Sequence, residues 1–362
     1  MRRTSFGKAL LRTVVSLIVL ALTVVAGYAA YVMIAFHRLG DQPLAVEGAV
    51  PETVLETDRS YTVLSFNIGF GAYEPDYGFF MDGGTESRAW SRTRLNDNLA
   101  RIAVFLEEQR ADAVLLQEVD FDSTRTYRVD ERVYFTSALK NFAYTYAQNY
   151  DSPYLFYPIT KPHGASHSGL LTFSSFPIAS AERVELPIET GFTKFLDLDR
   201  CYAKNRIPLD NGKDLVLYNF HLSAYTSDGT IATEQLKRLL LDMKNEYEKG
   251  CFAIAGGDFN KDLLGNSSDY FGKPEKTYLW AQPIPEGLFD GTHVTLVAPF
   301  DADAPVPSCR NADGPYHKGQ FVLTIDGFLV TDNVTAEAAR VIDTGFAYSD
   351  HNPVEMTFRL KS

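Results

Sequence analysis

From residue 58 onward the chain repeats one pattern: a short apolar run, rich in residues that favour β-strands, ends in a polar side chain capable of chemistry. Three such runs are Tyr61–Phe66, Ala113–Leu116 and Cys251–Ala255. A fourth run ends at His221. The polar residues at or just after the ends of the four runs are Asn67, Glu118, His221, Asp258 and Asn260. Because amphipathic helical segments lie between the runs, the pattern predicts an α/β domain. Functional side chains gather at strand ends in such domains, so we expect these residues to converge on one site.

Helices are predicted where apolar residues recur every three or four positions. Ser91 is a suitable N-cap for a helix that extends to about Gln109, and Asp130–Lys140 and Thr230–Glu248 are the next two expected helices. The remaining expected strands are Gly169–Ser174, Ala181–Leu186, Leu198–Pro208, Asp214–His221, Leu323–Val330 and Val354–Leu360. A turn at residues 210–212 (Asp-Asn-Gly) predicts a hairpin between two of them. Residues 262–320 are expected to be rich in loops.

The N-terminus contains an apolar stretch long enough to cross a membrane. Val14–Phe36 is nearly all apolar, and its length of about 23 residues suffices to span a bilayer. The basic residues that precede it are Arg2, Arg3, Lys8 and Arg12. They predict a cytoplasmic N-terminus and an extracytoplasmic body. A cleaved signal peptide is the alternative, because Ala26–Ala30 contains small residues, but the apolar run continues past them.

These features divide the chain into four parts. We expect a basic cytoplasmic segment at residues 1–13, a transmembrane signal-anchor helix at 14–36, a linker at 37–57 and a folded domain at 58–362. The linker is assigned because it contains Pro43, Pro51 and scattered acidic residues.

The charge of the chain limits its partners. The formal net charge is −12, and residues 1–38 hold five basic and no acidic residues, which leaves 29 basic against 46 acidic residues in the remainder. An acidic body repels a polyanion, so extended nucleic-acid binding is disfavoured. A deep pocket with a bound cation could still accept one phosphate group.

Composition and cysteine content indicate a folded protein without a zinc site. Hydrophobic residues make up 45% and charged residues 22% of the chain, which is typical of a protein with a substantial core. The three cysteines, Cys201, Cys251 and Cys309, show no metal-binding spacing. We expect Cys251 to be a buried thiol, and the pairing of Cys201 with Cys309 stays open.

The candidate chemical residues are rich in oxygen ligands and contain no thiolate. Asp326, Asp350 and His351 join the strand-end residues in this set. Oxygen ligands suit a hard cation, so Mg²⁺ is expected, with Mn²⁺ as the alternative. The histidines are then available to contact anionic oxygen atoms or to move protons. Such a set suits phosphoryl transfer, which needs mainly positioning and neutralisation of charge.

Six short motifs follow one another in a distinctive order. They are Ser65-Phe66-Asn67, Leu116-Gln117-Glu118-Val119, Asn219-Phe220-His221-Leu222, Gly257-Asp258-Phe259-Asn260, Ile325-Asp326-Gly327-Phe328 and Ser349-Asp350-His351-Asn352-Pro353-Val354. In this order they resemble the signature motifs of the endonuclease/exonuclease/phosphatase superfamily, over nearly all of the chain after the linker. One such motif is weakly specific, whereas six in family order are strongly so.

The resemblance implies a fold and a reaction. The fold is a four-layer α/β sandwich with two mixed β-sheets packed face to face and helices outside, preceded here by one N-terminal transmembrane helix. Residues 58–362 are then a catalytic domain, and the reaction is in-line attack of water on phosphorus without a covalent intermediate. The superfamily includes nucleases, sphingomyelinases, inositol-phosphate phosphatases and deadenylases, which share this chemistry but not the leaving group.

The resemblance also implies a role for each matching residue. Glu118 matches the main metal ligand of the family, with Asn67 beside it and Asp350 as a further carboxylate at the metal. Asp258 matches the residue that orients or deprotonates the attacking water. The residues implied to contact or support the scissile phosphate are His221, Asn260, His351 and its carboxylate partner Asp326. Arg125 and Tyr127 are added as candidate substrate-binding residues, the first because it resembles an arginine of some family branches.

Each motif has a structural alternative when taken singly. Asn67 could cap a turn, and residues 257–260 could form a tight turn; the family order of the motifs favours catalysis. His163 and His167 either border the substrate pocket or are exposed loop histidines, and the second interpretation is favoured. Residues 308–311 are either substrate-facing or a surface turn, and the aromatic stretch Tyr134–Tyr157 is expected to serve packing.

Three functions follow from these features. The favoured one is a membrane-anchored, metal-dependent phosphodiesterase with its catalytic domain on the extracytoplasmic side, acting on a lipid headgroup or a small phosphoester. The second is an extracytoplasmic endonuclease or exonuclease acting on DNA or RNA. The third is a catalytically silent binding module. We infer no protein partner, and the oligomeric state stays open.

Overall fold

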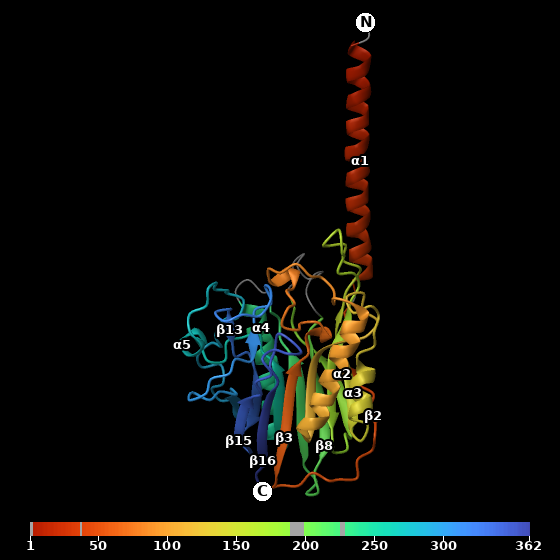
Figure 1. The fold of residues 1–362 in the computed structure, drawn as a ribbon. Coiled ribbons are helices and arrows are strands. Elements are labelled where there is room, and N and C mark those ends of the chain that lie inside the picture. Colours follow the sequence, from red (N-terminus) through yellow and green to blue (C-terminus); the bar gives the residue numbers. More distant parts are fainter. Residues whose placement is uncertain (1–2, 37, 189–198, 225–228) are drawn as a thin grey trace.

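A long helix projects from a body built of two β-sheets. The computed structural model describes residues 3–36, 38–188, 199–224 and 229–362, so the predictions that involve Arg2 and Leu198 concern residues outside the described ones. Helix α1 (Arg3–Ala35) leads away from one end of the body, and the C-terminus lies at the opposite end (Figure 1). Part of α1, Phe6–Ala35, is long and apolar enough to cross a membrane, and none of its most apolar window is buried.

Each of the two large sheets has seven strands. The first is ordered β1 (Gln42–Pro43), β7 (Ser180–Glu185), β8 (Cys201–Pro208), β9 (Asp214–His221), β10 (Phe252–Asp258), β14 (Asp326–Thr331) and β11 (Val294–Val297). The second is ordered β15 (Val334–Val341), β16 (Val354–Leu360), β3 (Ser60–Asn67), β4 (Ala113–Asp120), β6 (His167–Ser174), β5 (Ala143–Asp151) and β2 (Glu47–Gly48). Strands β12 (Cys309–Arg310) and β13 (Val322–Leu323) form a separate pair. Both large sheets are mixed, because β9–β10 and β3–β4 are parallel and their neighbours are antiparallel.

Alternation of side chains along the strands explains why the sheets stack. Val63 of β3 and Leu115 of β4 point toward the other sheet, where they join Leu217 of β9 and Ile254 of β10 in one buried cluster. The intervening residues, such as Phe66, point to the outer face. Successive side chains of a strand lie on opposite faces, so an apolar run buries both faces of its sheet.

Helices cover the outer faces. Helix α2 (Arg92–Gln109) packs Leu99 and Ile102 onto the β3–β4 face, and helix α4 (Thr230–Glu248) packs residues such as Leu239 onto the β9–β10 face. The Ser91 side chain accepts a hydrogen bond from the Arg94 amide, as expected of an N-cap. The shorter helices are α3 (Arg132–Ala138), α5 (Ser268–Phe271), η1 (Gly69–Gly71) and η2 (Phe80–Asp82). The layers are therefore helix, sheet, sheet and helix, which confirms the predicted four-layer sandwich.

Several elements differ from the sequence prediction. Strand β5 occupies part of the aromatic stretch for which only packing was expected, and β15 was not predicted. Most of β15 is accessible to solvent, and its alanines and charged residues carry little β-propensity. Helix α3 is shorter than Asp130–Lys140, and β4 continues to Asp120. Within the loop-rich segment 262–320, the structure adds α5, β11 and β12.

The segment expected as a linker lies against the sandwich. Strand β1 pairs with β7 and β2 pairs with β5, so this segment extends both sheets. Leu55 is completely buried.

The three cysteines are free, which excludes a Cys201–Cys309 disulfide, and Cys251 is half-buried rather than buried.

Candidate active site

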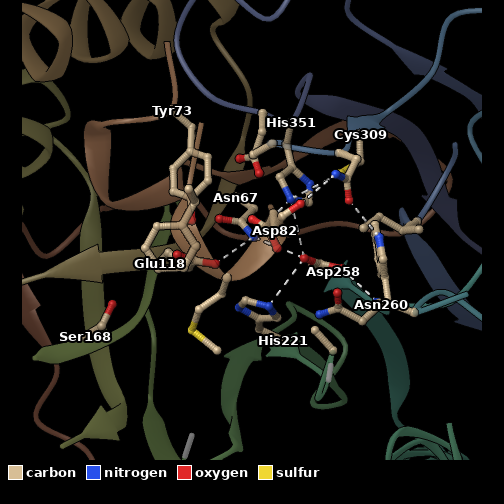
Figure 2. Close-up of a pocket in the computed structure, with 18 of the residues that line it drawn as sticks. Asn67, Tyr73, Asp82, Glu118, Ser168, His221, Asp258, Asn260, Cys309 and His351 are labelled. Carbon is tan, nitrogen blue, oxygen red and sulfur yellow. Dashed lines mark hydrogen bonds and ion pairs between the residues drawn. The ribbon is translucent and has the colours of Figure 1, made fainter. Parts of the chain in front are cut away.

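The strand register brings five of the predicted residues to one end of the sandwich. In the parallel β9–β10 pair Asp258 lies opposite His221, and in the antiparallel β10–β14 pair it lies opposite Asp326. Strands β3 and β4 run parallel in the other sheet and carry Asn67 and Glu118 at the same end. The two sheets thus contribute side chains to a common space, as Figure 2 shows.

That space is a cavity of about 310 Å³. Seven of the eight predicted catalytic and metal-binding residues line it: Asn67, Glu118, His221, Asp258, Asn260, Asp350 and His351. The eighth, Asp326, does not line the cavity but forms a hydrogen bond with His351, which does. The expectation that these distant residues converge therefore agrees with the structure.

Asn67 connects the two halves of the site. Its Nδ2 donates to Asp258 Oδ2 at 3.1 Å and to Glu118 Oε1 at 3.4 Å, and it lies 3.4 Å from His351 Nε2. Its Oδ1 accepts a hydrogen bond from the Gly69 amide at 3.0 Å. Asn67 therefore does stabilise a local turn, while its amide nitrogen joins three residues of the site.

Glu118 is held in a strained backbone conformation. Its φ is 55°, and the β4–β6 pairing is irregular between Leu116 and Val119. Left-handed backbone at a non-glycine residue costs about 1–3 kcal/mol and is concentrated at functional sites. A β-bulge redirects a side chain that regular pairing would bury in the sheet. The bulge thus presents the Glu118 carboxylate to the cavity.

Asp258 is surrounded by polar partners. Its Oδ1 accepts from the Asn260 amide at 2.8 Å, and its Oδ2 lies 3.4 Å from His221 Nε2. Burial, assisted by the nearby Asp326 carboxylate, raises the pKa of Asp258 to about 7. Burial also lowers the pKa of His221 well below its ordinary value. His221 is therefore neutral and presents one ring nitrogen to Asp258.

His351 and Asp326 form a buried pair. His351 Nδ1 lies 2.8 Å from Asp326 Oδ2, which also accepts a 2.7 Å hydrogen bond from Ser308 Oγ. Burial disfavours the charged imidazole, but the Asp326 carboxylate outweighs this effect and the pKa of His351 lies well above its ordinary value. The other ring nitrogen, Nε2, is 3.7 Å from Asp258 and from Cys309 Sγ. The pair thus presents a protonated imidazole to the cavity.

The donor set fits a hard divalent cation. Glu118 and Asp350 supply carboxylate oxygen atoms at the cavity wall, and Asn67 lies beside them with its amide nitrogen toward Glu118. The pKa of Asp350 is raised, mainly by burial, with Glu118 adding repulsion that His351 and Arg310 partly offset. A cation there would stabilise both carboxylates. Asp258, Asp326 and His351 also place donor atoms within 4.8 Å of one another, but His351 and Asp326 already satisfy each other as an ion pair.

The two candidate substrate-binding residues have different positions. Arg125 lines the cavity, where two of its guanidinium nitrogens donate to Asp120 at 2.8 Å each and its guanidinium lies 3.9 Å from the Phe70 ring centre. Tyr127 is not among the lining residues, because its hydroxyl donates to the Ala89 carbonyl at 3.0 Å and its ring packs on the core. The position of Tyr127 therefore does not support substrate binding.

Sequence reasoning missed several residues of the cavity wall. Arg200 lines it just before β8, and no motif marks this residue. Tyr73, Met81 and Trp280 come from long loops whose conformation the sequence pattern does not fix. Residues 309–311 do line the cavity, so the substrate-facing interpretation of that segment agrees with the structure.

His163 is a buried structural residue, not the exposed loop histidine that was expected. It is 3% exposed, its Nδ1 lies 2.9 Å from the Ser87 carbonyl oxygen, and its Nε2 lies 3.2 Å from Ser166 Oγ. Its ring packs against Phe79 and Phe80. Burial lowers its pKa to about 4. His163 is therefore neutral, and its hydrogen bonds connect the loop that contains Ser87 with its own loop at the cavity wall. His167 is half-buried and pairs with Asp151.

This burial predicts an acid-sensitive stability. Between pH 6.5 and pH 4 the unfolded chain binds a proton at His163 and the folded chain does not, so stability falls as the pH decreases, by about 3 kcal/mol across the window. We expect His163→Gln to flatten the dependence of the unfolding free energy on pH, measured by denaturant titration at pH 7, 6 and 5. The control Val133→Ser alters an exposed side chain that does not titrate and should keep the wild-type slope. Equal slopes in His163→Gln and the wild type would contradict the assignment.

Comparison with known proteins identifies relatives of the sandwich. The model of the Endonuclease/Exonuclease/phosphatase family matches residues 64–351. No curated protein matches the chain.

Solved structures share the fold. An endonuclease/exonuclease/phosphatase from Beutenbergia cavernae is 18% identical with a TM-score of 0.57, and the alignment covers 84% of this chain and 72% of that one. ANGEL2, a 2',3'-cyclic phosphatase in complex with adenosine-2',3'-vanadate, is 17% identical with a TM-score of 0.55, covering 88% and 99%. The human Nocturnin catalytic domain with bound sulfate is 15% identical with a TM-score of 0.51, covering 88% and 98%. At these identities the similarity concerns the fold alone.

Proposed function

Because the chain belongs to the endonuclease/exonuclease/phosphatase family, we propose that it is a Mg²⁺-dependent phosphodiesterase that hydrolyses its substrate by in-line attack of water. The observation that carries this proposal is the convergence of Glu118, Asp258 and His351 on one cavity from separate parts of the chain. A silent binding module is disfavoured, because strained backbone and buried acidic groups lower the stability of the fold and are concentrated at functional sites.

Glu118, Asp350 and Asn67 are the residues that would hold the cation. The carboxylate oxygens of Glu118 and Asp350 and the repulsion between these two groups support this assignment, and Asn67 lies beside Glu118. A bound Mg²⁺ would neutralise charge on a phosphoryl oxygen and help to ionise water. Mn²⁺ has the same ligand preference and is the alternative.

The remaining residues would act on the phosphate and the water. Asp258 accepts hydrogen bonds at the centre of the site, so it is suited to orient the attacking water and receive its proton. His351, held by Asp326, would donate to a phosphoryl oxygen as charge develops there. His221 and Asn260 would position the phosphate. The Asn260 side chain already donates to the Leu222 carbonyl at 2.7 Å, which fixes its orientation.

The N-terminal helix supports membrane anchoring. Helix α1 satisfies the length requirement, and Lys8 and Arg12 near its start favour a cytoplasmic N-terminus. We therefore propose residues 1–13 as cytoplasmic, 14–36 as the anchor, and the catalytic domain as extracytoplasmic.

A lipid headgroup or another small phosphoester is the proposed substrate. A cavity of about 310 Å³ suits a phosphate with a small leaving group. The acidic body disfavours a long nucleic acid, which would gain affinity from many phosphate contacts. A nuclease on DNA or RNA is the second candidate and is supported by the range of chemistry known for this fold.

A substrate panel tests the proposal. The full chain in nanodiscs is given Mg²⁺, Mn²⁺ or EDTA together with sphingomyelin, phosphatidylinositol phosphates, bis(p-nitrophenyl) phosphate, 2',3'-cyclic AMP, DNA or RNA. We expect turnover of a lipid or small phosphoester that EDTA lowers by at least about 100-fold. Cleavage of nucleic acid alone would favour the nuclease. Absence of turnover and of metal binding would favour the silent module.

A further inference from the structure

An exposed apolar loop lies beside the cavity end of the sandwich. Residues 153–160 contain no charged side chain. Phe156, Tyr157 and Ile159 are 57%, 67% and 86% exposed. Isolated exposed apolar residues are ordinary, but three within four positions form a patch of the kind that contacts a membrane or a partner.

The same loop contacts the C-terminal part of α1. The Tyr154 amide donates to the Tyr31 hydroxyl at 3.0 Å, and the Tyr28 hydroxyl donates to the Tyr154 carbonyl at 3.2 Å. The Tyr28 and Phe156 rings meet edge to face with centres 5.4 Å apart. Tyr28 precedes the end of the helix at Ala35 by about two turns, or roughly 10 Å along its axis. The loop therefore lies at the depth of the outer end of the proposed span, where tyrosines are typical of the membrane interface.

A second set of contacts fixes the orientation of α1 on the body. Immediately after the helix, Arg38 Nε donates to Asp199 Oδ1 at 3.0 Å, and the Leu39 amide donates to Asp199 Oδ2 at 2.9 Å. Asp199 also pairs with the fully buried Arg183 at 3.0 Å. With the tyrosine contacts, this cluster holds the helix at two places. Helix α1 leaves from the end of the sandwich opposite the C-terminus (Figure 1), and the antiparallel pairing of β16 with β3 places Asn67 and the cavity at that same end.

The loop is continuous with the cavity wall. The Tyr157 ring lies 5.6 Å from that of Phe80, and Phe80 packs on His163, which lines the cavity. The neighbouring Met81 lines the cavity and is 49% exposed. An apolar surface thus extends from α1 across the loop to the wall of the cavity.

We infer that residues 153–160 insert into the outer leaflet of the bilayer that α1 crosses, and that the cavity consequently takes its phosphoester from a lipid of that leaflet. The inference rests on the proposed function and names its substrate class. The acidic body is repelled by anionic surfaces, so insertion depends on apolar contact and favours a zwitterionic leaflet.

Fluorescence quenching measures the position of the loop without reference to catalysis. In a Cys251→Ser background, Ile159→Cys carries an environment-sensitive dye and the full chain is placed in phosphatidylcholine nanodiscs containing brominated lipid. Cys201 and Cys309 are buried, and burial raises the pKa of each thiol to about 12, so they react little with the dye. The control Val133→Cys labels another exposed apolar position, on α3.

We expect brominated lipid to quench the dye at position 159 at least about threefold more than the dye at 133, as an interfacial position requires. Equal quenching at both positions overturns the inference, whatever the enzyme hydrolyses.

A matched kinetic experiment tests the substrate class. The double variant Phe156→Ser/Ile159→Ser should lower hydrolysis of lipid in nanodiscs about tenfold, because the loop no longer partitions into the interface. Hydrolysis of bis(p-nitrophenyl) phosphate should not change, since neither residue lines the cavity. Val133→Ser should behave as the wild type in both assays.

The outcomes separate the inference from the proposed function. Quenching at 159 with hydrolysis of soluble substrate but of no lipid overturns the lipid assignment and leaves the phosphodiesterase. Quenching at 159 without hydrolysis of any phosphoester overturns the proposed function and supports the membrane contact alone. The double variant could also lose hydrolysis of lipid and of soluble substrate equally while its melting temperature is unchanged. That result overturns the inference that the loop gives the cavity access to lipid.

Discussion

Asp258→Asn is expected to lower kcat/KM for bis(p-nitrophenyl) phosphate by about 10³-fold or more. Asp258 Oδ2 accepts from the Asn67 amide at 3.1 Å and lies 3.4 Å from His221 Nε2. An amide in its place has the same shape but cannot receive a proton, and general base catalysis typically contributes 10²–10⁴-fold. Steady-state hydrolysis by the full chain in nanodiscs gives the measurement.

The fold of this variant should be intact. Burial raises the pKa of Asp258, which means that the folded state disfavours the charged carboxylate. Above pH 7 in EDTA, removal of that charge should therefore leave the melting temperature unchanged or higher. Asp332→Asn, a half-exposed residue paired with His293, is the matched control and should retain full activity. An Asp258→Asn enzyme within tenfold of the wild type would exclude the proposed role.

The part of the site that the sequence predicted is the part set by strand register. Once β9 and β10 are parallel neighbours, residues at equal distances from their ends must lie side by side, as His221 and Asp258 do. On β3 and β4 the register pairs Asn67 with Gln117, the residue before Glu118, so register brings Glu118 close to Asn67 and the bulge turns its side chain toward the cavity. Local apolar runs of four to eight residues are sufficient to identify such strands.

The parts that could not be predicted depend on contacts between loops. The sequence around His163 looks like an exposed polar loop, and only its packing against Phe79 and Phe80 buries it. Tyr127 is close to Arg125 in sequence, yet a left-handed turn with φ of 54° at Tyr127 directs the two side chains to different surroundings. Strand β15 pairs along the edge of its sheet despite a composition that predicts no strand. In each case tertiary contacts outweigh local preference.

Glu118→Gln is expected to lower metal-dependent turnover strongly by removing the charge of the main proposed ligand. The variant keeps the size and the hydrogen-bonding oxygen of the side chain, so the loss reflects the lost negative charge. We expect Mn²⁺ affinity, measured by calorimetry, to fall at least about 100-fold, and kcat/KM to fall by about 10³-fold. Glu107→Gln, on the exposed surface of α2, is the control and should bind metal as the wild type does. Wild-type Mn²⁺ affinity in Glu118→Gln would place the cation elsewhere in the cavity.

A second substitution at this position separates metal binding from backbone strain. Glycine adopts a φ of 55° without the steric cost that Glu118 bears, so Glu118→Gly should unfold at the same or a higher temperature than the wild type in EDTA. It should nevertheless lack Mn²⁺ binding and turnover. In saturating Mn²⁺ the order should reverse, because only the wild type gains stability from the bound ion. If Glu118→Gly is instead less stable than the wild type in EDTA, the bulge is held by contacts of the Glu118 side chain within the protein, and its strained conformation would no longer argue for a metal ligand.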